Sequence, residues 1–210
     1  MLLPFLDQTP NGNKGGKDTF QTPAYALKPL LPYLPTDAWI WEPACGNCNL
    51  VRALNAHGYS HVAGTDIQLS PTQDYFLISG PGDIYEDWHV QITNPPYSRK
   101  RAWLQRAFAL DKPFALLIQA WFEEWNCLLF HQYDVEILLP LQRINFETPQ
   151  GYGSGAFFKT MWVTWQLGIG QQITYVDLDP EREEYEAQAR AEGRRFTIKK
   201  AVDAGLLEAR

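Results

Sequence analysis

Short apolar segments alternate with amphipathic ones along most of this chain. Four apolar runs are predicted to be buried strands, at residues 38–42, 61–67, 90–93 and 114–119. Apolar positions at helical spacing predict helices at residues 50–58, 99–110 and 123–130. Strands that alternate with helices indicate a mostly parallel sheet with helices on both faces. We therefore expect an α/β, Rossmann-like fold.

The later part of the chain departs from this alternation. Segments 135–146 and 160–167 are strand-like and flank a glycine-rich loop, which predicts a hairpin that adds an antiparallel strand at one edge of the sheet. Residues 181–192 are highly charged and predict a solvated helix. We divide the chain into a mobile N-terminal segment (1–17), a main domain (18–178) and a charged helical tail (179–210).

Composition narrows the partners that this chain can have. A length of 210 residues allows one domain with a substantial core. The net charge of −6 argues against broad, charge-driven binding of nucleic acids, so such contacts would need local basic patches. Three cysteines suggest no disulfide framework, and neither a signal peptide nor a membrane-spanning run is visible, so we expect the cytoplasm and no membrane partner.

The sequence Asn94-Pro95-Pro96-Tyr97 follows the predicted strand 90–93 directly. In open α/β sheets, ligands bind at the carboxyl ends of the strands. The Asn94 side chain offers an amide oxygen, the two prolines stiffen the turn, and Tyr97 supplies a flat ring on which a base or amide can stack. These residues are suited to hold a planar amine for attack on an electrophile. A turn that merely ends the strand is the alternative.

A second group of residues has the order of a nucleoside-binding site. The small-residue loop 42–49 joins the first predicted strand to the helix after it, where the backbone can approach a ligand closely. Asp66 ends the second strand, about 20 residues after Gly46, the spacing expected of a carboxylate that binds ribose hydroxyls. Asp83, at the end of an expected third strand, could accept a hydrogen bond from an adenine amine.

With these motifs the chain resembles S-adenosylmethionine-dependent amino-methyltransferases, and most closely the small adenine-N6 DNA methyltransferases of phages and prophages. The resemblance runs from about Asp18 to Trp165. It implies a class I methyltransferase fold, S-adenosylmethionine as the cofactor, DNA as the partner, no metal, and the cytoplasm of a bacterium or a phage-infected cell. The motif order, with Thr-Pro first, then the cofactor loop and then NPPY, is similar to the gamma arrangement of these enzymes.

The resemblance also implies roles for individual residues. The cofactor would be bound by Thr22, Pro23, Glu42, Pro43, Ala44, Cys45, Gly46, Asp66, Ile67, Asp83, Ile84 and Asn94. Asn94, Pro95, Pro96 and Tyr97 would be catalytic. A cluster of cations, Arg99, Lys100 and Arg101, could meet phosphates beside the target base. Phe158 could stack on that base. Core packing for Phe158 and an ordinary solvated helix start for the cations are the alternatives.

Several features keep other functions open. Cys48 replaces the second glycine of the family's cofactor loop, and the chain has no room for a separate target-recognition domain. Cys45 and Cys48 have the C-x-x-C spacing of metal or redox sites, but no pair of further ligands accompanies them. A protein glutamine or an RNA base would offer the same planar amine as adenine. A methyltransferase-like module that binds without catalysis is the third possibility.

Overall fold

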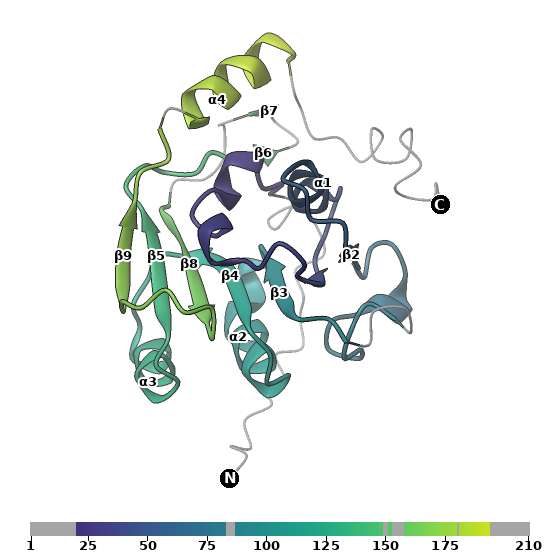
Figure 1. The fold of residues 1–210 in the computed structure, drawn as a ribbon, viewed down its shortest axis with the longest axis vertical. Coiled ribbons are helices and arrows are strands. Elements are labelled where there is room, and N and C mark those ends of the chain that lie inside the picture. The colour runs from purple at the N-terminus through teal and green to yellow at the C-terminus, as the bar shows by residue number, and fades with distance from the viewer. Residues whose placement is uncertain (1–19, 83–86, 149–150, 153–157, 180, 194–210) are drawn as a thin grey trace.

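A computed structural model of the chain describes residues 20–82, 87–148, 151–152, 158–179 and 181–193. Within them, seven strands form one mixed sheet in the order β2-β1-β3-β4-β8-β5-β9 (Figure 1). In chain order these strands are β1 (Ile40–Glu42), β2 (Val62–Gly64), β3 (Val90–Thr93), β4 (Phe114–Gln119), β5 (Glu136–Pro140), β8 (Thr160–Trp165) and β9 (Ile173–Val176). Strands β6 (Glu147–Thr148) and β7 (Gly151–Tyr152) pair separately.

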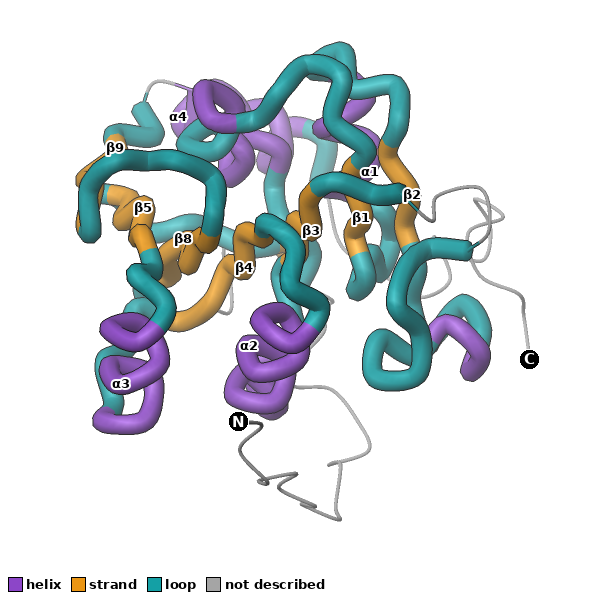
Figure 2. The backbone as a smooth tube through the Cα atoms, turned by 60° about the horizontal axis from the view of Figure 1, so that its bottom comes forward, coloured by secondary structure: helices purple, strands orange, loops and turns teal. Residues whose placement is uncertain are grey.

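Helices lie on both faces of the sheet, as Figure 2 shows. They are α1 (Asn49–Ala56), α2 (Lys100–Ala109), α3 (Glu124–Gln132) and α4 (Glu181–Ala191), with 3-10 turns η1 (Ala24–Leu27), η2 (Leu31–Tyr33), η3 (Pro71–Gln73) and η5 (Tyr97–Arg99). Side chains of a strand alternate between faces. Leu116 of β4 packs in one core cluster with Leu104 of α2, whereas Leu117 belongs to a second cluster with Leu27 of η1 and Leu54 of α1. The predicted α/β fold with helices on both faces is confirmed.

The antiparallel strand lies inside the sheet and not at its edge, so that part of the prediction is wrong. The hairpin between β5 and β8 is present, with Glu136 opposite Thr164, but β8 also pairs with β4 over its whole length. Five of its six residues are buried, because both of its faces are covered. The edge belongs to β9, which was not predicted; Ile173 and Tyr175 are exposed along it, and it runs parallel to β5.

The expected third strand before Asp83 is not formed by the described residues 65–82, which contain only turns and η3. The reason is local. Proline, glycine and serine recur through this stretch, and such residues favour turns over strands. Asp83 and Ile84 lie outside the described residues.

The charged helix α4 packs back onto the domain at one end. The ring of Tyr185 meets the ring of Tyr25 edge-on at 5.4 Å, and the buried Glu186 accepts a hydrogen bond from Asn145 Nδ2 at 2.8 Å. The helix is therefore less solvated than its composition predicts. Among the described residues, no helix has the length and apolar character needed to cross a bilayer.

Candidate active site

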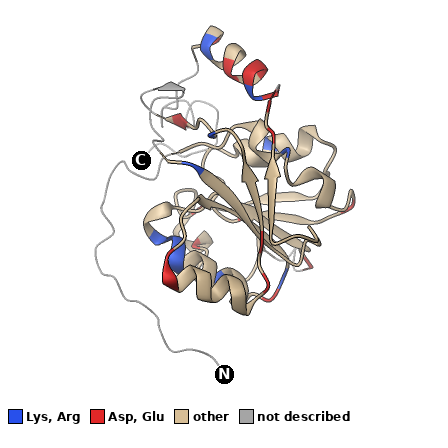
Figure 3. Cartoon of the chain, turned by 90° about the vertical axis from the view of Figure 1, so that its left-hand side faces the viewer, with Lys and Arg blue, Asp and Glu red and all other residues tan. Residues whose placement is uncertain are grey.

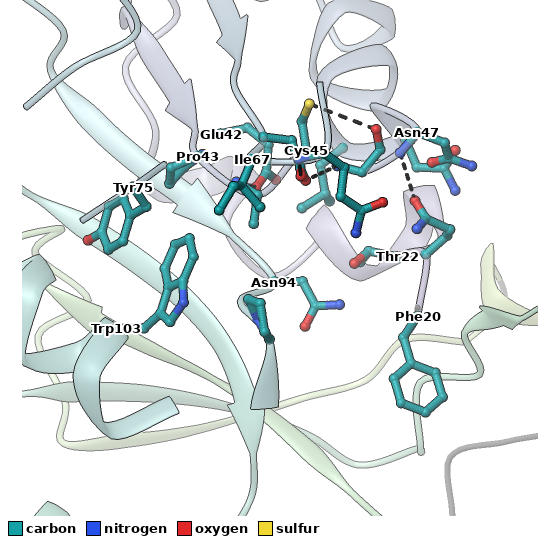
Figure 4. Close-up of a pocket in the computed structure, with 18 of the residues that line it drawn as sticks. Phe20, Thr22, Glu42, Pro43, Cys45, Asn47, Ile67, Tyr75, Asn94 and Trp103 are labelled. Atoms are coloured by element: carbon teal, nitrogen blue, oxygen red, sulfur yellow. Dashed lines mark hydrogen bonds between the residues drawn. The ribbon is translucent and has the colours of Figure 1, made fainter. Parts of the chain in front are cut away.

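The predicted site residues gather in one pocket at the carboxyl ends of β1, β2 and β3. The chain passes from β1 to β2 on one side and then crosses to β3 on the other, and the crevice at such a reversal is the usual ligand site of open α/β sheets. The predicted residues that line the pocket are Thr22, Glu42, Pro43, Ala44, Cys45, Gly46, Asp66, Ile67, Asn94, Pro96 and Arg99 (Figure 4). Pro23, Pro95, Tyr97, Lys100, Arg101 and Phe158 do not line it.

The loop after β1 uses its backbone donors internally. Each N–H group from Ala44 to Cys48 donates to an acceptor in the protein. In order, the acceptors are Glu42 Oε1 (3.2 Å), Thr65 O (3.1 Å), Asp66 Oδ2 (2.9 Å), Gln21 Oε1 (3.1 Å) and Cys45 O (2.6 Å). Phosphate-binding loops depend on N–H groups that point at the ligand. This loop therefore offers no such cradle for a phosphate.

Two residues of the loop adopt left-handed backbone conformations. Gly46 has φ +51°, and a Cβ atom there would lie 2.9 Å from the side-chain amide of Gln21. Cys48 has φ 60° and ψ 32°, a conformation that glycine adopts without strain but that costs another residue roughly 1–2 kcal/mol. Cys48 therefore holds a backbone conformation that a glycine at this position would also take.

The pocket is acidic. Burial raises the pKa of Glu42 to about 8, and burial also raises the pKa of Asp66. Asp66 nevertheless accepts hydrogen bonds from the N–H groups of both Gly46 and Gln68, at 2.9 and 2.8 Å. Asp74 lines the pocket too, whereas Arg99 is the only cation among the described residues that line it. A positively charged ligand would stabilise the ionised carboxylates, so this pocket favours one.

The two loop cysteines are close together. Their Sγ atoms are 3.2 Å apart, and both are free thiols. Hydrogen bonding between them raises the pKa of Cys45 and lowers that of Cys48 to about 7. Within the described part of the chain, no cluster of three or more metal-ligating side chains is found.

The turn after β3 leaves an acceptor open. The Asn94 Oδ1 atom is buried and has no hydrogen-bond partner among the described residues. The Asn94 side chain projects into the pocket between Thr22 and Trp103 (Figure 4). A buried polar atom without a partner is costly, and one that faces a pocket is explained by a ligand that satisfies it.

An aromatic group surrounds Tyr97 beside the pocket. Its ring centroid lies 6.3 Å from that of Phe20, 6.5 Å from that of Phe146 and 5.3 Å from that of Phe158. Phe20 also lines the pocket. The structure thus places Phe158 next to the NPPY turn, where the sequence predicted a stacking residue.

Several lining residues were missed by the sequence analysis: Phe20, Gln21, Asn47, Asp74, Tyr75, Phe76 and Trp103. Tyr75 and Trp103 form one wall, with rings stacked 3.9 Å apart and nearly parallel. The Gln21 side chain accepts a hydrogen bond from the Asn47 N–H group in the loop after β1, and its backbone pairs with Glu147 in both directions. Only the position of Gln21 beside Thr22-Pro23 could have pointed to it.

No protein-family model matches this chain, and no curated protein matches its sequence. Two solved structures share part of its fold. One is a Pyrococcus horikoshii protein provisionally assigned as an RNA methyltransferase, with 14% identity and a TM-score of 0.44, covering 73% of this chain and 91% of that one. The other is a Thermoplasma acidophilum protein, with 15% identity and a TM-score of 0.39, covering 67% and 84%. Similarity this distant carries no argument about the reaction.

Proposed function

We propose that this protein transfers a methyl group from S-adenosylmethionine to the exocyclic N6 amine of adenine in DNA, with the target base rotated out of the helix. The observation that carries the proposal is the Asn94 oxygen at the end of β3, which has no partner among the described residues and lies in the same pocket as residues Glu42 to Asn47 of the loop after β1. A base stacked in a duplex cannot reach such a pocket, so it must be extruded at a cost of a few kcal/mol.

The chemistry of the pocket fits this cofactor. S-Adenosylmethionine is a nucleoside without phosphates that carries an ammonium, a sulfonium and a carboxylate, and therefore a net positive charge. Asp66 and Asp74 line the pocket and supply negative charge that suits such a ligand, whereas Glu42 holds its proton in the folded protein. The N–H groups of the loop are all occupied. Thr22 would contact the methionine part, and Ile67, which is 52% exposed, would lie against the adenine ring. When bound, the cofactor supplies a methyl group activated by the positive sulfur.

The residues after β3 would prepare the amine. Asn94 Oδ1 and the Pro95 carbonyl would accept its two N–H groups, which draws the nitrogen lone pair out of conjugation with the ring. Tyr97 would stack on the base and hold the nitrogen in line with the methyl group. Bound S-adenosylmethionine would supply the methyl group, exchanging its S–C bond for the new N–C bond, and the nitrogen would then release its surplus proton to water. No metal takes part in this scheme.

Two features favour a nucleobase over the amide of a protein glutamine. The rings of Phe20 and Phe158 beside Tyr97 suit a large flat substrate. Arg99 and Arg101 are exposed beside the same edge of the sheet and suit phosphates. Cys48 keeps the left-handed backbone conformation that a glycine would adopt, so the loop has the same shape with either residue. This weakens the alternative of a module that no longer binds the cofactor.

Labelled S-adenosylmethionine tests the proposal directly. The protein is incubated with separate pools of DNA, RNA and protein, and we expect label in DNA, on adenine N6. Label in RNA or on protein glutamine instead would show that RNA or protein, and not DNA, is the substrate. Calorimetry that detects no binding of S-adenosylmethionine, with no label in any pool, would instead indicate a non-catalytic module.

A further inference from the structure

A row of aromatic rings and cations lies beside the pocket, where α2 begins and β4 ends. The Arg99 guanidinium lies 4.1 Å from the ring centroid of Phe76, and both residues line the pocket mouth. The Lys100 ammonium lies 4.2 Å from the ring centroid of Trp121, which follows β4. Because β3 and β4 are parallel neighbours, the segments that follow them emerge at the same edge of the sheet.

Two adjacent aromatic side chains just after β4, Trp121 and Phe122, are unusually exposed. Trp121 has 52% of its surface accessible and its neighbour Phe122 has 51%. Large aromatic side chains usually bury most of their area, so two adjacent exposed rings beside an active-site pocket suggest a binding surface. We call Arg99, Arg101, Trp121 and Phe122 the stacking ridge.

The protein holds the ridge in place. Asn126 is buried, and its Nδ2 atom donates to the Trp121 carbonyl at 2.7 Å. Asn126 Oδ1 accepts from the N–H group of Glu123 at 2.8 Å, within the capping box that begins α3. A surface ordered before binding loses less conformational entropy when a ligand arrives.

Positive charge remains available on the ridge despite two nearby carboxylates. Glu123 is 3.5 Å from Lys100 and accepts a hydrogen bond from Trp125 Nε1, so its charge is compensated; Glu124 is exposed. Arg99 and Arg101 are both exposed, and neither forms an ion pair with any carboxylate among the described residues. Figure 3 shows charged residues at the ends of the lower helices and on α4, while the sheet is almost free of them.

We propose that the stacking ridge binds unpaired nucleotides that flank the target base. Single-stranded DNA, in which the base need not be extruded from a duplex, would then be preferred over a duplex in which it must be. Exposed rings that bind successive bases by stacking, combined with cations for the phosphates, are the usual means of holding single strands. Bases in a duplex are stacked on one another and cannot use the rings. This inference rests on the proposed function for its biological meaning, but the binding surface can be tested separately.

A thymidine oligonucleotide provides the test, because thymine has no exocyclic amine and cannot be methylated in the proposed reaction. Binding is measured by fluorescence anisotropy with the full chain. We expect Trp121→Ala and Phe122→Ala each to weaken binding of the single strand by about 10-fold or more. Arg101→Ala should lower the slope of log K against log salt concentration by about 1, whereas the ring variants should leave that slope unchanged.

Matched controls come from exposed residues elsewhere. Tyr175 on β9 is 67% exposed and lies three strand positions from β4, and the Arg190 side chain on α4 is 65% exposed. Tyr175→Ala and Arg190→Ala should bind the oligonucleotide as the unaltered protein does, and Trp121→Phe should retain most of the affinity. Unchanged circular dichroism and cofactor binding verify that the ridge variants are folded.

Three results would overturn the inference: ring variants that bind normally, control variants that bind as weakly as the ring variants, or a duplex of equal length that depends equally on Trp121. Asn94→Ala should bind the thymidine strand normally. If no pool is methylated but the ridge variants lose affinity, only the proposed reaction fails. If DNA is methylated but Trp121 and Phe122 have no effect on binding, only the ridge fails.

Discussion

Two loops meet in the pocket, and they differ in the hydrogen bonding of their backbone N–H groups. In the loop after β1, the N–H groups from Ala44 to Cys48 all have partners within the protein. In the turn after β3, two prolines remove donors altogether, and the Asn94 Oδ1 atom stays buried without a partner among the described residues. The first loop uses its backbone donors to keep its shape, although Asn47 Oδ1 in it is also buried without a partner among the described residues. In the second loop the turn has no such network of backbone donors, and its Asn94 acceptor lines the pocket.

This contrast separates structural residues from reactive ones. Asp66 looked like a ligand-binding carboxylate in the sequence, but both of its oxygens also accept hydrogen bonds from backbone N–H groups: one from Gly46 in the loop and one from Gln68, two residues further along the chain. A carboxylate can accept further hydrogen bonds, so the two roles are compatible. Asn94 has no comparable structural duty for its oxygen. Changes in the first loop should therefore alter stability and cofactor affinity, and changes at Asn94 should alter the reaction.

The largest expected effect is at Asn94. We expect Asn94→Ala to lower the rate of methyl transfer by roughly 10²–10³-fold, the usual loss when a positioned hydrogen-bonding group is removed from a reacting centre. The affinity for S-adenosylmethionine should change little. Transfer is followed with labelled cofactor and affinity by calorimetry. Asn94→Asp, which keeps acceptor oxygens, should retain more activity; full turnover by the alanine variant would exclude the proposed role.

The next effect concerns Glu42 and depends on pH. Its pKa rises from 4.5 to about 8 on folding, so the folded protein holds a proton that the unfolded chain releases. Stability from this group is complete below pH 4.5 and is lost as pH rises to about 8, at up to about 1.4 kcal/mol per pH unit. The glutamine in a Glu42→Gln variant would have no proton to lose, so this variant should not lose stability as pH rises. At pH 8 its free energy of unfolding should exceed that of the unaltered protein by a few kcal/mol.

Urea unfolding at pH 4.5, 6 and 8 measures this difference. The gain of the glutamine variant should grow with pH and should be smallest at pH 4.5. A gain that is the same at all three values would mean that Glu42 is not neutral in the folded protein.

Asp66→Asn should have a smaller effect on stability. An amide offers one acceptor oxygen to the two N–H groups of Gly46 and Gln68, so one of these partly buried hydrogen bonds is lost, at a cost of about 1 kcal/mol. Cofactor affinity should fall in parallel. Denaturant unfolding and calorimetry measure both quantities. Asp134→Asn, in an exposed turn, is the matched control and should change neither.

The smallest expected effect is at Cys48. Cys48→Gly relieves the left-handed strain but gives the unfolded chain more freedom, so the free energy of unfolding should change by less than about 1 kcal/mol. Cofactor affinity should be retained. Gly46→Ala is the opposite change and should be worse, because its Cβ would meet the Gln21 amide at 2.9 Å. If Cys48→Gly lowered the free energy of unfolding as much as Gly46→Ala does, the expected tolerance of glycine at position 48 would be wrong.

The local sequence was sufficient to predict an element where the residues of that element alone indicate its type and its ends. Strands β3 and β4 have the predicted bounds, because continuous apolar runs of that length favour buried strands whatever their neighbours are. Helix α1 ends shortly before Gly58, and Glu123 begins α3 as its N-cap. The position of Asn94 at the end of a central strand followed from the same signals.

Tertiary structure alone decided which segments meet. Whether β8 lies at the edge or between β4 and β5 depends on pairing across more than forty residues, and local periodicity does not encode it. The pairing of Gln21 with Glu147 and the stacking of Tyr75 on Trp103 likewise join segments that are distant in the chain. The sequence therefore determined the elements and the reactive turn, while long-range packing determined the pocket walls, because burial and hydrogen bonding depend on neighbours that only the folded chain provides.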